Sequence, residues 1–143
     1  MARRQIIIFT IGCWAAIATA ALHLVGHVSG PAPATDEAGR QLLELATNYK
    51  HLMPGGSERS LMDFLNGFSL SFSVFLALIG GLGLIVVKRG HGDGTLMMAV
   101  ARAMALASLV LVVISLSYWF IVPSLLLALV AVCFLTAGVR PPG

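Results

Sequence analysis

Two histidines four residues apart, His23 and His27, carry the strongest chemical signal in this sequence. Residues at positions i and i+4 lie on the same side of an α-helix, so both imidazoles face the same surroundings. A neutral imidazole accepts and donates hydrogen bonds, moves protons and binds metals. The pair therefore predicts a binding site, or a structural contact between this helix and a neighbour.

Polar residues elsewhere in the chain are candidates to complete the site. Asp63 and Asn66 open a second apolar segment, and Tyr118 lies near the end of a third. We therefore expect a ligand-binding set made of His23, His27, Asp63, Asn66 and Tyr118. A metal is an alternative ligand, because imidazoles and a carboxylate form common metal sites. Its candidate ligands are His23, His27, His51 and Asp63.

Haem and zinc-protease chemistry do not fit this pattern. Transmembrane bis-histidine haem needs histidines on two different helices, and the later apolar segments contain none. The run His-Leu-Val-Gly-His also lacks the glutamate of the HExxH motif. The sequence does not identify a cofactor. A membrane enzyme that uses a histidine as base is a further interpretation, although the sequence favours a non-catalytic role.

The composition places these residues in a membrane protein. Of the 143 residues, 58% are hydrophobic and only 10% are charged, against about 25% charged in soluble domains. This excludes an ordinary soluble enzyme. Apolar segments long enough to cross a bilayer core of about 30 Å occupy residues 6–28, 64–87, 96–120 and 123–139. The sequence predicts one all-α membrane domain with four transmembrane helices in an up-down-up-down bundle.

Basic residues near the segment ends predict the orientation. Cytoplasmic loops carry an excess of lysine and arginine, and one side of the predicted bundle has Arg3, Arg4, Lys88, Arg89, Arg102 and Arg140. The other side mixes three basic residues with the acids Asp36, Glu37, Glu44, Glu58 and Asp63. We therefore expect a multi-pass protein of the cell membrane with both termini in the cytoplasm. The loop from Ser29 to Met62 then faces outward.

The outward loop carries its own helical pattern over residues 35–53. Apolar residues recur there at intervals of three and four, namely Leu42, Leu45, Ala46, Tyr49, Leu52 and Met53. Thr35 is a suitable N-cap, and Pro54-Gly55-Gly56 would end the helix. We expect an amphipathic helix that lies on the outer membrane surface or covers the mouth of the bundle.

Small and polar residues predict which helix faces point inward, because small residues let helices in lipid approach closely. On the first segment these are Gly12, Ala16, Thr19 and Ala20, which share a face with His23, Gly26 and His27. On the second they are Ser69, Ser73, Ala77 and Gly80, following Asp63 and Asn66. Four phenylalanines occupy a different face and are expected to meet lipid: Phe64, Phe68, Phe72 and Phe75.

These observations predict a small integral membrane protein with an outward-facing polar pocket for an apolar or amphipathic ligand or a metal. The alternative is an accessory or assembly subunit of a larger membrane complex, in which the histidines are structural. The expected partners are the lipid bilayer and partner membrane subunits or further copies of the chain. No basic cluster is dense enough to follow a phosphate backbone, which argues against nucleic acid.

Overall fold

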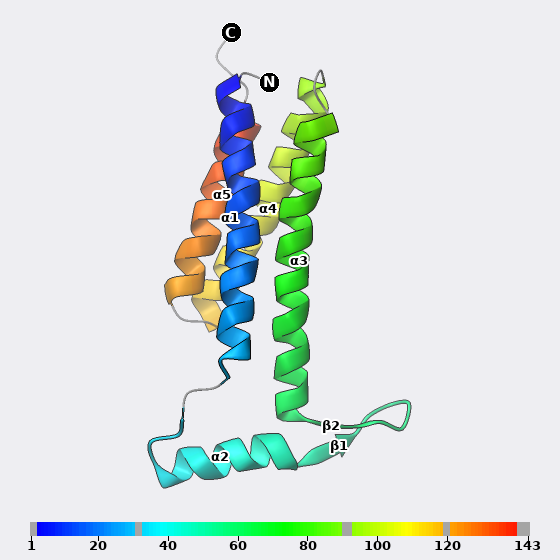
Figure 1. Cartoon of the computed structure of the whole chain (residues 1–143), viewed down its shortest axis with the longest axis vertical. Coiled ribbons are helices and arrows are strands. Elements are labelled where there is room, and N and C mark those ends of the chain that lie inside the picture. Colours follow the sequence, from blue (N-terminus) through cyan, green and yellow to red (C-terminus); the bar gives the residue numbers. More distant parts are fainter. Residues whose placement is uncertain (1–2, 31–32, 90–92, 119–120, 140–143) are drawn as a thin grey trace.

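The computed structural model describes residues 3–30, 33–89, 93–118 and 121–139. These residues form five helices and one short β-hairpin (Figure 1). In chain order the elements are α1 (Arg3–Val28), α2 (Glu37–Asn48), β1 (Lys50–Leu52), β2 (Glu58–Ser60), α3 (Leu61–Arg89), α4 (Gly94–Tyr118) and α5 (Ile121–Gly138).

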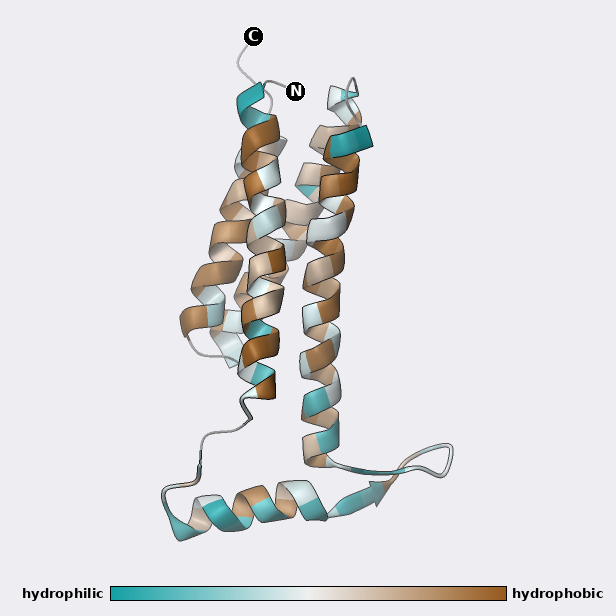
Figure 2. Cartoon of the chain, in the orientation of Figure 1, coloured by the Kyte–Doolittle hydropathy of each residue, from teal (hydrophilic) through white to brown (hydrophobic). Residues whose placement is uncertain are grey.

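Four of the helices, α1, α3, α4 and α5, are long and apolar enough to cross a membrane. Figure 2 shows hydrophobic residues along most of their length and hydrophilic residues near their ends, whereas α2 is mixed. The prediction of four helices of transmembrane length and composition is therefore confirmed, and this supports a helical multi-pass membrane protein. The predicted end of the third span, residue 120, lies outside the described residues.

Each long helix begins where local chemistry favours it. The Asp93 carboxylate accepts hydrogen bonds from the backbone N–H groups of Thr95 at 3.1 Å and Leu96 at 2.9 Å, which caps the start of α4. Pro123 lies in the first turn of α5, where a proline costs no helical hydrogen bond. Ser60 and Asp63 cap the start of α3 reciprocally.

Helix α1 is the centre of the packing. It packs along α3 and along α5, and α4 packs along α5, whereas α3 and α4 barely touch (Figure 1). The side-chain amide of Gln5 donates to the carbonyl of Val139, so α1 begins beside the end of α5. We call this the terminal end of the bundle, and the opposite end the α2 end. Arg102 Nε also donates to the Gly138 carbonyl there, at 2.9 Å.

Glycines allow the closest helix contacts. A Cβ atom at Gly80 would lie 2.5 Å from the Cys13 carbonyl oxygen of α1, and one at Gly12 would lie 2.9 Å from Cys133 Cβ of α5. Gly83 likewise faces Cys13. Because only a residue without a side chain fits at such positions, these glycines set the distance between the helices.

The hydrophobic core fills the terminal end and the middle of the bundle. Its larger cluster comprises Phe9, Cys13, Ala16, Ala101, Ala105, Val130, Phe134 and Ala137. A smaller cluster of Ala20, Leu76 and Leu127 continues it toward the α2 end. As predicted, Gly12, Ala16, Thr19 and Ala20 of α1 are buried, and so are Ser73 and Gly80 of α3. Ala77 is exposed, contrary to expectation.

The predicted helix over residues 35–53 is wrong beyond Asn48. Residues Lys50–Leu52 form β1, which pairs antiparallel with β2 so that His51 lies opposite Arg59. Gly55 and Gly56 have φ angles of 98° and 83°, and this left-handed turn folds the chain back for pairing. The cap of α2 is Asp36 rather than Thr35, because the Asp36 carboxylate accepts from the Gly39 N–H at 2.7 Å.

Helix α2 crosses the open end of the bundle with no fully buried residue (Figure 1). Its Leu42 and Leu45 side chains are more than half exposed, at 69% and 61%. Leu43 and Ala46 are half-buried. The helix therefore leaves an apolar face uncovered by the rest of the chain.

Candidate functional site

A pocket of about 1050 Å³ opens at the α2 end, beyond the point where the hydrophobic core stops. Helices α1 and α3 form two of its walls, the last residue of α4 and the first turns of α5 form a third, and α2 contributes from the mouth. Most of the lining is apolar. The polar lining residues are Thr19, His23, His27, Thr47, Asn66, Ser69 and Tyr118. Four of the five predicted ligand-binding residues thus line one pocket.

His23 is fixed in place by two contacts with α3. Its Nε2 atom lies 3.1 Å from the hydroxyl oxygen of Ser69. Its ring also meets the ring of Phe72 edge to face, with 5.0 Å between the ring centroids. The contact joins the end of α1 to the first third of α3. His23 therefore has a packing role whatever else it does.

Phe72 was predicted to face lipid, but it faces the pocket instead. It is half-buried, because it packs against His23 and against the Ala20, Leu76 and Leu127 cluster. The other three phenylalanines are exposed, at 39% for Phe64, 73% for Phe68 and 65% for Phe75. Phe72 follows Ser69 by three residues and so lies on the same helix face. That spacing was the sequence signal for its place in the pocket.

His27 differs from His23, although both line the pocket. The ring of His27 is half-buried, and the described residues supply no hydrogen-bond partner to it. The same holds, within the described part of the chain, for the side chains of Asn66 and Tyr118. These three groups are available to a ligand.

The remaining hydroxyls of the pocket are occupied by the protein itself. Thr19 donates to the Ala15 carbonyl and Thr47 to the Leu43 carbonyl, both at 2.8 Å. Such bonds to the preceding turn satisfy a hydroxyl within its own helix. Leu43 and Thr47 lie four residues apart on α2, and sequence reasoning did not include them in the site.

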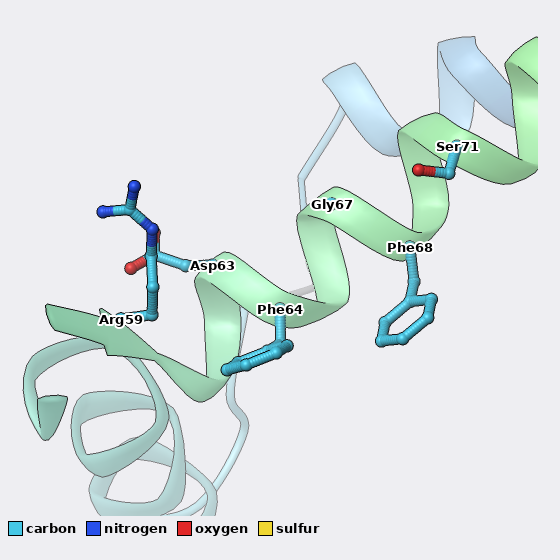
Figure 3. A pocket seen from close by; sticks show the side chains of 6 residues that line it. All are labelled: Arg59, Asp63, Phe64, Gly67, Phe68 and Ser71. Carbon is cyan, nitrogen blue, oxygen red and sulfur yellow. The ribbon is translucent and has the colours of Figure 1, made fainter. Parts of the chain in front are cut away.

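Asp63 is not brought together with the histidines. Its carboxylate accepts the Ser60 N–H at 2.9 Å, and the Ser60 hydroxyl accepts the Asp63 N–H at 3.1 Å. It lines a separate groove of about 290 Å³ on the outer side of α3. Figure 3 shows this groove, in which Arg59 and Asp63 lie side by side and Phe64 and Phe68 project from successive turns.

His51 also lies away from the pocket. It belongs to β1, where its ring stacks edge to face on Tyr49 at a centroid distance of 4.7 Å. Among residues 3–30, 33–89, 93–118 and 121–139, no three His, Cys, Asp or Glu side chains gather into a set that would hold a metal. The geometry therefore does not assemble the predicted metal ligands.

The arrangement is an apolar pocket with a few polar groups at its mouth and no acid beside its histidines. It can hold an apolar body and donate hydrogen bonds to one polar end. No protein-family model, no curated protein and no solved structure matches this chain.

Proposed function

We propose that this chain is a small integral membrane protein that binds an amphipathic ligand in the pocket at the α2 end. The pocket volume of about 1050 Å³ carries the proposal. Small-molecule sites typically measure about 300–1,000 Å³ and combine an apolar lining with a few polar groups that orient the ligand. His27, Asn66 and Tyr118 supply such groups here.

The pocket favours binding over catalysis or metal coordination. His23 and Ser69 form a histidine–hydroxyl pair, but no carboxylate lines the pocket to orient the imidazole. Asp63, the carboxylate that was predicted from the sequence to lie beside the histidines, caps α3 instead. The described residues also offer no third metal ligand. Binding of a ligand, by contrast, requires neither a carboxylate nor a third metal ligand. It requires only hydrogen-bonding groups such as those of His27, Asn66 and Tyr118.

We further propose an up-down-up-down crossing of the cell membrane with both termini in the cytoplasm. The Gln5–Val139 bond at one end and the His23–Ser69 contact at the other support alternating helix directions. Exposed basic residues support the orientation, because Arg3, Arg4, Lys88 and Arg89 all belong to the terminal end. The pocket and α2 then face outward, with the apolar side of α2 on the membrane surface.

Cysteine labelling in intact cells tests this orientation. The native Cys13 and Cys133 are buried, so an introduced exposed cysteine dominates the reaction with an impermeant maleimide. We expect Ser57→Cys, in the hairpin turn, to be labelled from outside. Thr95→Cys, at the start of α4, is expected to react only after the membrane is permeabilised. The reverse pattern would overturn the orientation.

Substitutions of the two histidines are expected to have different effects on stability and on bound lipid. His27→Leu removes a donor that the described residues do not use, so the melting temperature should hold while bound lipid is lost. His23→Leu breaks the bond to Ser69 and should lower the stability by about 0.5–1.5 kcal/mol. The measurements are thermal unfolding in detergent and mass spectrometry of lipid extracted from the purified protein.

Two controls make this experiment selective. Ser69→Ala should lower the melting temperature as His23→Leu does, because both changes remove the same bond. Ser71→Ala, two residues further along α3 and outside the pocket, should change neither measurement. If His27→Leu lowered the melting temperature and retained its lipid, His27 would be a packing residue and the proposed site would be wrong.

An accessory-subunit role is the second candidate, and the groove of Figure 3 favours it. Gly67 and Ser71 line this groove beside the exposed rings of Phe64 and Phe68. Small residues of this spacing allow a second helix to approach closely in lipid. The two roles make different demands on Gly26, which lines the pocket, and Gly67, which lines the outer groove.

A further inference from the structure

The charge of the pocket lining restricts what the ligand can carry, if the pocket binds one as proposed. None of its lining residues is Asp, Glu, Lys or Arg. On α2, the Glu37 carboxylate and the Arg40 guanidinium pair with each other at 2.8 Å. A charged group moved out of water is costly unless an opposite charge meets it. The lining therefore disfavours a phosphate, a carboxylate or an ammonium group in the ligand.

The available polar groups define what the head must offer. The side chains of His27, Asn66 and Tyr118 can all donate hydrogen bonds, whereas the hydroxyls of Thr19 and Thr47 are already donating to backbone carbonyls. Several donors, without an Asp, Glu, Lys or Arg side chain among the lining residues, suit a neutral oxygen acceptor. Carbonyl, ester and hydroxyl oxygens have this character.

The shape of the pocket indicates where an apolar chain goes. Ala20, Leu76 and Leu127 close the pocket toward the middle of the bundle, so a long chain cannot continue along the axis. Among the described residues the side remains open, because α3 and α4 barely touch. Three lining residues on that rim are more than half exposed, at 53% for Leu65, 81% for Tyr118 and 55% for Val122. The opening lies between α3 on one side and Tyr118 and Val122 on the other.

We infer that the pocket takes an uncharged long-chain lipid with an oxygen-bearing head, such as a monoacylglycerol, that enters sideways from the bilayer. The head lies at His27, Asn66 and Tyr118, and the chain leaves between α3 on one side and Tyr118 and Val122 on the other. This inference rests on the proposed function and adds the chemical class of the ligand and its route.

Competition among lipids with one oleoyl chain and three different heads tests the inference. The protein in nanodiscs is labelled with monooleoylglycerol that carries a photoreactive diazirine in its chain, and the labelled residues are located by fragmentation of the peptides and quantified. The competitors are monooleoylglycerol, the same molecule with a phosphate on its glycerol, and oleyltrimethylammonium. We expect label at Leu65 or Val122, and displacement by monooleoylglycerol at about tenfold lower concentration than by either charged lipid.

The outcomes separate the inference from the proposed function. Equal or better displacement by the phosphate or the ammonium lipid would leave a lipid site but overturn the neutral head. Label confined to the outer α3 groove at Phe64 and Phe68, or no specific label, would overturn the proposed function as well. Label at other pocket-lining residues of α1 and α3, with none at Leu65 or Val122, would overturn the sideways route alone.

Discussion

Gly80→Leu is expected to prevent α1 from packing on α3 and to abolish the folded bundle. A Cβ at this position would lie 2.5 Å from the Cys13 carbonyl oxygen and 2.6 Å from Ile17 Cγ1. The carbonyl belongs to a helix backbone, so it cannot move aside as a flexible side chain would. Overpacking typically costs about 1–3 kcal/mol and sometimes more, and a leucine against backbone belongs at the upper end.

The neighbouring glycine supplies the control. A Cβ at Gly81 would meet no atom within 4 Å, so Gly81→Leu adds the same side chain on a free face of the same helix. The measurement is the melting temperature in detergent, together with the fraction of protein that elutes as one species. We expect a large loss for Gly80→Leu and no loss for Gly81→Leu. Equal melting temperatures would contradict the packing of α1 on α3 through Gly80.

The long helices could be predicted from the sequence because lipid leaves few choices. A chain that crosses a bilayer must satisfy each backbone group internally, so a long apolar run becomes a helix. Helix ends were less exact, because the third span was predicted from residue 96, whereas α4 begins at Gly94 with Asp93 as its cap. The buried small residues of α1 followed from the same reasoning, since close helix contacts need them.

The loop was harder because its structure depends on a pairing between distant residues. Tyr49, Leu52 and Met53 continue the helical spacing of α2, and nothing in that spacing opposes a longer helix. The structure instead pairs Lys50–Leu52 with Glu58–Ser60 across the turn at Gly55 and Gly56. A periodicity rule weighs neighbours three and four positions away and cannot represent this alternative.

Part of the candidate site could be predicted from the sequence, and part could not. His23, His27, Asn66 and Tyr118 come together because each lies near the same end of its helix, which the spans already implied. Asp63 lies elsewhere because a local interaction competes for it. The spacing Ser60-x-x-Asp63 resembles a capping box, and that short-range bond directs the carboxylate to the helix start. The local capping bond therefore determines the position of the Asp63 carboxylate, and the more distant histidines do not.

Gly26→Phe is expected to remove bound ligand without changing the fold. Gly26 lines the pocket, and a Cβ there would meet no atom within 4 Å, so the new ring fills open space instead of the core. Because the ring occupies the volume that the ligand needs, bound lipid should fall at least about tenfold, which corresponds to about 1.4 kcal/mol. The melting temperature in detergent should stay at the wild-type value in the absence of lipid.

Native mass spectrometry of the gently purified protein and two phenylalanine variants tests the central claim most directly. Gly67→Phe is the matched control, since Gly67 also has open space at its Cβ but lines only the outer α3 groove. We predict that the wild type and Gly67→Phe carry a lipid mass that Gly26→Phe lacks. Equal lipid on all three proteins, or a bound second polypeptide that only Gly67→Phe loses, would contradict a ligand site in the pocket.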